Sequence, residues 1–342
     1  TTAVTLTSTE GAIVDGGDTG GADVITTSGR LVIDAVTGVG SGAAIETTVA
    51  SVDIDNATSG NIEISETNAL TVFKAVQGTA GNIDIAAGGT MTVDNAGAGN
   101  AITAAGSGTI ALSTSGGGDV LINSSIESVT GAIVVAANHI LTIANGTVID
   151  AGSGTIGLQA QENITLGQVI TTNTGTAAVT LTSAVGGIVD GGDTGGADVI
   201  AGGRLVIDAV TGVGNGAAIE TTVASVDIDN ATSGNIEISE TDAITVFKAV
   251  QGTAGNIGIA AGGTITVDNA GGNAITVLGT GTVTLDANGG TSDILINDGI
   301  LSVNGAITLT ADNDVTFLGT GDLASTAGAI SVRADADDGG VS

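Results

Sequence analysis

Short pairs of aliphatic residues recur along this chain at intervals of about 21 to 27 residues. The pairs begin at Ile62, Ile83, Ile110, Ile133 and Ile156, and in each pair one residue separates the two aliphatic side chains. This alternation predicts a strand that buries one of its faces. A second series of pairs follows close behind the first, and Gly, Asn, Ser and Asp fill the intervals, as turns require. The chain is therefore predicted to consist of short strands and turns.

Two or three strands of about five residues in each interval, with no helical pattern, predict the turns of a parallel β-helix. We therefore expect an all-β fold, a single parallel β-helix solenoid of about 15 coils of 21–27 residues, with each strand about 4.8 Å above its equivalent. The alternative is a β-propeller or a sandwich of short hairpins. Propeller blades repeat at about 40 residues with aromatic signatures, and neither feature is seen here. The coil boundaries between residues 7 and 60 stay open, because Leu31/Ile33 and Val52/Ile54 fit either series.

The chain is also nearly two copies of a longer unit of about 174 residues. Residues 30–90 return at 204–264, and the two segments differ at only four of 61 positions, which are Ser41/Asn215, Asn68/Asp242, Leu70/Ile244 and Asp84/Gly258. We expect super-repeat copies at residues 1–175 and 176–342 that form one continuous solenoid, as a piece of a longer array.

Charge and composition exclude several classes of function. The chain has 36 acidic and five basic residues, for a formal net charge of −31. Nucleic acid is excluded as a partner because a phosphate backbone needs a basic face, and anionic membrane surfaces are disfavoured for the same reason. No apolar run is long enough to span a bilayer, so we expect no membrane insertion in this segment. The chain has no cysteine, which excludes disulfides and thiolate chemistry.

One glycine- and aspartate-rich string, "VDGGDTGGADVI", occurs at residues 14–25 and again at 189–200. Ca²⁺ takes about six to eight oxygens from carboxylates and turn carbonyls, and glycine lets the backbone fold around the ion. A turn with solvated carboxylates and a phosphate loop are the alternatives, and the phosphate loop lacks its helix and lysine. We expect no required cofactor, with calcium as the candidate ion. The calcium candidates are Asp15, Asp18, Asp23, Asp190, Asp193 and Asp198.

No catalytic set can be assembled from the sequence. His139 is the only histidine and has no histidine counterpart in the second copy, so we expect it in a surface loop. Neither a Ser–His–Asp or Cys–His arrangement nor a zinc-type cluster exists, and we expect no catalytic residue and no enzyme activity. Lys74 would point inward if alternation continued past Val72, which is costly. We expect the strand to end at Val72 and Lys74 to meet an outward acid such as Glu66.

Phrases such as "GTIALSTSGGGDVLIN" and "AAGGTMTVDNAGAGNAIT" resemble the repeats of filamentous-haemagglutinin-type exoproteins and other large bacterial surface adhesins. Those repeats read, loosely, G-x-I-x-L-x-A-x-x-x-L-x-L-x-A-x-G-x-I, and the likeness extends over nearly all of the chain. The resemblance implies a right-handed parallel β-helix, export across the cell envelope, and a role as an extended stalk or adhesive fibre. The long super-repeat is not part of the family pattern.

From these features we expect a structural and adhesive segment of a giant bacterial surface protein, extracellular at the cell surface, that mediates cell-surface or cell-cell and matrix attachment. The expected partners are neighbouring repeats or copies of the chain end to end, with cell-surface glycans or proteins as candidate ligands. A surface-layer or sheath-type structural subunit is the alternative. A polysaccharide-acting β-helix enzyme fits less well, because Trp and Tyr for stacking sugars are absent and Arg and Lys are scarce.

Overall fold

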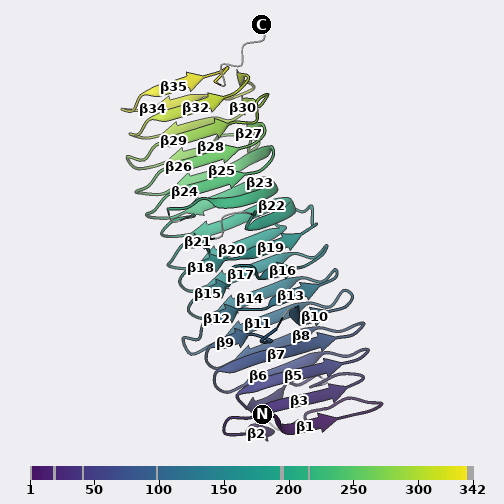
Figure 1. The fold of residues 1–342 in the computed structure, drawn as a ribbon. Coiled ribbons are helices and arrows are strands. Elements are labelled where there is room, and N and C mark those ends of the chain that lie inside the picture. The colour runs from purple at the N-terminus through teal and green to yellow at the C-terminus, as the bar shows by residue number, and fades with distance from the viewer. Residues whose placement is uncertain are drawn as a thin grey trace. The chain divides into compact units, whose positions relative to one another are not determined.

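The computed structural model describes residues 2–17, 21–40, 42–97, 99–192, 196–214 and 216–336. The chain forms two compact units, Thr1–Asn173 and Thr174–Ser342. Within the described residues all regular elements are β-strands, which follow one another in stacked turns in each unit (Figure 1). A search of the same residues for helices long and apolar enough to cross a membrane finds none.

The strands of the first unit are β1 (Thr2–Thr7), β2 (Val24–Ile25), β3 (Arg30–Ala35), β4 (Ile45–Thr48), β5 (Ser51–Asn56), β6 (Ile62–Glu66), β7 (Leu70–Gln77), β8 (Ile83–Ala87), β9 (Met91–Val93), β10 (Asn100–Ala104), β11 (Ile110–Thr114), β12 (Val120–Ile122), β13 (Ser125–Ser128), β14 (Ile133–Ala137), β15 (Leu141–Ile143), β16 (Val148–Asp150), β17 (Ile156–Ala160), β18 (Ile164–Leu166) and β19 (Gln168–Thr171). The strands of the second unit are β20 (Val179–Ser183), β21 (Ile188–Asp190), β22 (Val199–Ala209), β23 (Ile219–Asn230), β24 (Ile236–Glu240), β25 (Ile244–Gln251), β26 (Ile257–Ala261), β27 (Ile265–Val267), β28 (Asn273–Val277), β29 (Val283–Ala287), β30 (Ile294–Ile296), β31 (Gly299–Ser302), β32 (Ile307–Ala311), β33 (Val315–Phe317), β34 (Leu323–Ser325) and β35 (Ile330–Arg333).

Equivalent strands of successive turns pair in parallel, and apart from register shifts at several bulges like residues stack on like. In the first unit, β8, β11, β14 and β17 form one such ladder, and Ile83, Ile110, Ile133 and Ile156 are paired in succession. The predicted all-β parallel β-helix is confirmed, with about 14 turns over the described residues where about 15 coils were expected.

The coil boundaries that the pattern left open are set by strand pairing. Leu31 pairs with Val52, and Ile33 pairs with Ile54, between β3 and β5. Val52 pairs in turn with Val72 of β7. Both aliphatic pairs therefore belong to the second series, in strands that are longer than β9, β12, β15 and β18, which continue this series in the first unit. After β7 two short strands take the place of the long one. β9 pairs with the start of β7, and β10 pairs with its end.

The inward aliphatic residues are removed from water. Ile83, Ile110 and Ile133 are each 0% exposed, whereas Val134, beside Ile133 on the opposite face of β14, is 42% exposed. Burying one such side chain contributes about 1.5–3 kcal/mol relative to leaving it in water. The stacked aliphatic ladders are therefore the main source of stability in each unit.

Glycine is required at one corner by the close approach of successive turns. Gly108 and Gly131 each stand two residues before an inward isoleucine. A Cβ on Gly131 would lie 1.9 Å from the carbonyl oxygen of Gly108, and a Cβ on Gly108 would lie 1.9 Å from that of Gly81. Gly108 and Gly131 are not among the positive-φ residues. At these positions the neighbouring turn fills the space that a side chain would need. Glycine is therefore required by close packing and not by a left-handed backbone conformation.

The expectation that the strand ends at Val72 is wrong. β7 continues to Gln77 through a β-bulge, where its register with β5 shifts after Val72. The extra residue is Phe73, so Phe73 and Lys74 are both half-buried on the outer side and Ala75 returns to the core. A bulge re-aims the side chains that follow it, and here it removes the conflict of an inward lysine.

Lys74 meets an outward acid, as expected, but the acid is Asp55 and not Glu66. Lys74 Nζ donates a hydrogen bond of 2.6 Å to Asp55 Oδ2. Glu66 is only 3% exposed, and its carboxylate accepts hydrogen bonds from Thr47 Oγ1 and the Val49 amide. Glu66 lies inside the unit and is therefore out of reach of an outward lysine.

The final described turn of the second unit leaves its inward positions exposed. Ile307 and Leu309 of β32 are 0% exposed. Ile330 and Val332, which stack on them in β35, are 45% and 44% exposed. Phe317 in the same turn is 46% exposed. Among the described residues β35 pairs only with β32, so one edge of the last ladder has no strand beside it.

Candidate metal centre

Three carboxylates meet where the glycine-rich string passes β4 in the first unit. Asp23 immediately precedes β2, and Glu46 lies in β4, which pairs with β2. The Asp23 amide donates to the Glu46 carbonyl at 2.8 Å, and the Glu46 amide donates to Asp23 Oδ2 at 3.1 Å. Asp15 completes the group, and its Oδ1 accepts the Gly17 amide at 3.0 Å.

The second unit repeats this arrangement with the second copy of the string. Asp190 ends β21, Asp198 immediately precedes β22, and Glu220 lies in β23. The Asp198 amide donates to the Glu220 carbonyl at 2.8 Å, and the Glu220 amide donates to Asp198 Oδ2 at 3.0 Å. Asp190 Oδ1 accepts the Gly192 amide at 2.8 Å.

In each group, one carboxylate oxygen from each residue lies within 4.8 Å of one from each of the others. We call Asp15, Asp23 and Glu46 the first triad, and Asp190, Asp198 and Glu220 the second triad. Four of the six calcium candidates from the sequence thus fall in the triads. The other two, Asp18 and Asp193, lie outside the described residues.

The two triads differ in their access to water. Asp198 is 1% exposed, whereas its equivalent Asp23 is exposed. Burial raises the pKa of Asp198 to about 8, and the carboxylates of Glu220 and Asp190 add to the rise, against the hydrogen bond from the Glu220 amide. In the first triad, loss of hydration chiefly raises the pKa of Glu46, and its acidic neighbours add to it. Both pKa shifts arise mainly from loss of hydration, and the neighbouring carboxylates add to them.

Several triad oxygens are buried and have no hydrogen-bond partner among the described residues. They are Oδ1 of Asp198, Oε2 of Glu220 and Oε2 of Glu46. Two carboxylate oxygens cannot satisfy each other without a proton or a cation between them. The ion pairs found in the described part of the chain engage basic side chains with other acids, in the pairs Arg30–Asp53, Lys74–Asp55, Arg204–Asp227 and Lys248–Asp229.

The donor set indicates which ion would fit. All the side-chain ligands are carboxylate oxygens, the type that Ca²⁺ and Mg²⁺ prefer, whereas zinc sites are built mainly from cysteine and histidine. Ca²⁺–oxygen distances of about 2.3–2.6 Å place two oxygens on opposite sides of the ion about 4.6–5.2 Å apart. The span of at most 4.8 Å in each triad is compatible with one such ion. Calcium binding itself stays a prediction.

Glu46 and Glu220 were missed by the sequence analysis. Each stands inside an ordinary alternating strand, one turn further along the chain than Asp23 and Asp198 respectively, and no local motif marks it. The only available signal is the interval of one turn, which places a residue of the next turn beside the aspartate. Recognising it required the register of β2 on β4, which the sequence left open.

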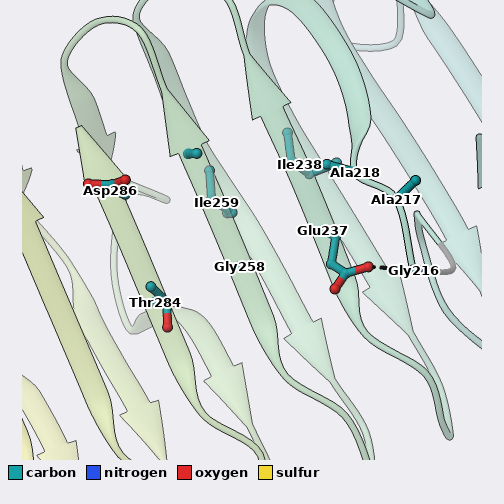
Figure 2. A pocket seen from close by; sticks show the side chains of 10 residues that line it. Gly216, Ala217, Ala218, Glu237, Ile238, Gly258, Ile259, Thr284 and Asp286 are labelled. Atoms are coloured by element: carbon teal, nitrogen blue, oxygen red, sulfur yellow. Dashed lines mark hydrogen bonds between the residues drawn. The ribbon is translucent and has the colours of Figure 1, made fainter. Parts of the chain in front are cut away.

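A groove of about 330 Å³ crosses the outer face of the second unit (Figure 2). Its lining includes Glu237, Gly258 and Asp286, and the Gly216 amide donates to Glu237 at 3.1 Å. The equivalent groove of the first unit measures about 250 Å³ and is lined by Asp84, the counterpart of Gly258. The outer faces of the two copies therefore differ at one of the few positions where their sequences differ.

His139 lies in the bend between β14 and β15, with its side chain 42% exposed. Its Nδ1 lies 2.7 Å from Asp119 Oδ1, and its Nε2 lies 3.4 Å from Glu162 Oε1. The hydrogen bond with Asp119 chiefly raises the pKa of His139. The three side chains form an acid-flanked imidazole on the surface, with no nucleophile among these contacts.

No family model matches the chain, and neither a curated protein nor a solved structure matches it.

Proposed function

We propose that the chain is a structural and adhesive segment of an extracellular fibre or stalk, part of a giant bacterial surface protein, with no catalytic role. The observation that supports this best is the stacking of equivalent strands in successive turns, in which Ile83, Ile110 and Ile133 are paired in succession. Each turn of a solenoid buries its aliphatic strip only against its neighbours, and in this proposal the exposed Ile330 and Val332 of β35, at 45% and 44%, form a contact surface. The partner is then a neighbouring repeat or another copy of the chain.

Aliphatic residues are also exposed on the first described strands of the first unit. Val4 and Leu6 of β1 are only half-buried, whereas Leu31 and Ile33, which stack on them in β3, are 0% exposed. Ile25 of β2 is 70% exposed. Exposed strand edges and aliphatic residues favour pairing with another chain.

Near-identical tandem copies support a role that depends on the length of the solenoid. Each repeat contacts only its neighbours, so duplicating the unit lengthens the solenoid and needs no new kind of contact. In this proposal the solenoid folds without a cofactor, and calcium bound at the triads makes the turns more rigid. The repeated outer faces, displayed at the bacterial cell surface, supply the contacts with cell-surface glycans or proteins.

Electron microscopy of the purified full chain tests the proposal. We expect copies to associate end to end into fibres, because association covers exposed aliphatic residues such as Ile25 and Ile330. The double variant Ile330→Lys with Val332→Lys should stop fibre growth, whereas Val134→Lys, at an exposed position in the middle of the first unit, should not. A wild-type chain that stays monomeric would contradict the proposal. Lateral growth into a two-dimensional sheet would favour the surface-layer alternative.

The adhesive part of the proposal needs a separate test. Beads coated with the chain should attach to cells or to a glycan array, and free chain should compete for the attachment. Attachment no greater than that of beads coated with an equally acidic unrelated protein would leave only the structural role.

A further inference from the structure

We propose that Asp190, Asp198 and Glu220 bind one calcium ion, and that the first triad binds a second calcium ion more weakly. The inference does not depend on the proposed role, because an ion can bind to a single chain whether or not copies associate or adhere.

The first argument is that buried carboxyl oxygens of the triad lack hydrogen-bond partners among the described residues. Asp198 is 1% exposed, yet its Oδ1 has no hydrogen-bond donor among the described residues, and the same holds for Oε2 of Glu220. Leaving such a group unsatisfied is costly, and the cost is greatest for a charge. Carboxylate oxygens of the three residues lie within 4.8 Å of one another, so a cation placed between them would satisfy all three residues.

The second argument is that the protein supplies a hydrogen bond to the other oxygen of each aspartate. Asp198 Oδ2 accepts the Glu220 amide at 3.0 Å, and Asp190 Oδ1 accepts the Gly192 amide at 2.8 Å. These bonds fix the orientation of both carboxylates and leave one oxygen of each for an ion. Supporting hydrogen bonds of this kind position the ligands of metal sites.

The third argument concerns the choice of ion. Three carboxylates provide hard oxygen ligands, the type that calcium and magnesium prefer. Calcium accepts an irregular shell of about six to eight oxygens, whereas magnesium demands near-ideal octahedral geometry at about 2.0–2.1 Å. An irregular set of side chains drawn from two turns suits calcium better.

The two sites should differ in affinity because they differ in exposure. Asp198 is buried and Asp23 is exposed, while the residue types and the backbone hydrogen bonds are the same. Attraction between an ion and a carboxylate is stronger where water is excluded. The ion in the second triad would also tie the end of β21 and the start of β22 to β23, so that three strands are held at one point.

Calcium titration of the full chain tests the proposal after treatment with chelator and dialysis into about 0.15 M salt. Isothermal titration calorimetry should resolve two saturable sites, with dissociation constants of about 10⁻³ M or tighter. The second triad should bind roughly tenfold more tightly than the first. Magnesium at equal concentration should compete poorly.

Single substitutions assign the sites. Asp198→Asn should abolish the tighter site, Asp23→Asn should abolish the weaker site, and each should leave the other. Asp242→Asn is the matched control, since it also removes one carboxylate and since the first copy carries asparagine at the equivalent Asn68. It should retain both sites.

Glu220→Gln is a second variant for the tighter site, in case Asp198→Asn fails to fold. It keeps the shape of the side chain and should also remove the tighter site. Luminescence of bound terbium, displaced by calcium, provides an independent readout on the wild-type chain. The proposal is overturned if wild-type chain shows no saturable binding at millimolar calcium. It is equally overturned if the Asp198 and Asp23 variants bind as the Asp242 control does, which would indicate diffuse counter-ions around an acidic surface.

Discussion

Thr47 Oγ1 donates a hydrogen bond of 2.8 Å to Glu66 Oε2 inside the first unit, where the two residues are 0% and 3% exposed. The same oxygen accepts the Val49 amide at 2.8 Å, and Oε1 accepts the Asn68 amide at 3.0 Å. This buried carboxylate is therefore fully provided with donors, in contrast to the carboxylates of the triads. It joins β4 to β6 and satisfies two backbone amides at the corners of the turn.

Replacing Glu66 by alanine should destabilise the first unit by about 1–3 kcal/mol, because the Val49 amide and the Thr47 hydroxyl would be left without an acceptor. Urea denaturation followed by circular dichroism measures the change. Glu10→Ala, at an exposed position, is the control and should shift the free energy of unfolding by no more than about 0.5 kcal/mol. Equal effects of the two substitutions would show that the Glu66 hydrogen bonds do not stabilise the fold.

Replacing Gly131 by alanine should cost about 1–3 kcal/mol through overpacking, because the new Cβ would meet the Gly108 carbonyl oxygen at 1.9 Å. Gly157→Ala is the matched control, since its Cβ would meet only Val134 Cγ2, at 4.0 Å. The control should be neutral or slightly stabilising, because alanine reduces the entropy of the unfolded chain. Thermal unfolding of both variants checks the difference, and a Gly131 variant as stable as the Gly157 variant would contradict the close stacking of turns.

The winding of the chain could be predicted from the sequence because it depends on a repeated local signal. Ile83, Ile110 and Ile133 are spaced by one turn, and alternation alone fixes which face of each strand is buried. Glycine was expected to form turns and, in the aspartate-rich string, to let the backbone fold around an ion. At Gly108 and Gly131 the reason is contact between turns, which becomes visible only when one turn is placed on another.

The parts that could not be predicted are those that depend on the register between turns. The bulge at Phe73 leaves no mark in the alternating pattern beyond the apparent inward Lys74. The pairing of Asp198 with Glu220 requires β22 to be aligned on β23. A sequence pattern of period two gives the face of a residue, but it does not give the neighbour of that residue in the next turn.

The two faces of β14 provide a direct test of the aliphatic ladder. Ile133→Ala should cost about 2–5 kcal/mol, since Ile133 is 0% exposed and its removal leaves a cavity between stacked isoleucines. Val134→Ala, one residue away on the outer face at 42% exposed, should change the free energy of unfolding by no more than about 0.5 kcal/mol. Denaturant titration of the two variants compares them, and similar losses of stability would mean that the inward ladder does not form the core.

His139 should make the stability of the first unit depend on pH. Hydrogen bonding with Asp119 chiefly raises the pKa of His139 above the usual value of 6.5, so the folded chain holds the proton more tightly than the unfolded chain. The stabilisation is fully present below pH 6.5 and is lost as the pH rises through the raised pKa.

The second copy supplies the control for this effect. Asn313 is the counterpart of His139 there, and its Nδ2 donates to Asp293 Oδ1 at 2.7 Å, so asparagine can occupy this place without a charge. His139→Asn should therefore keep the fold, match the wild type at high pH and be the less stable of the two at low pH. Urea denaturation from mildly acidic to mildly alkaline pH measures the free energy of unfolding of both proteins across the titration range of histidine. Because both proteins carry the same acids, the titration of those acids cancels in the difference between the two free energies. A difference that does not vary with pH would show that the imidazole gains nothing from its acidic neighbours on folding.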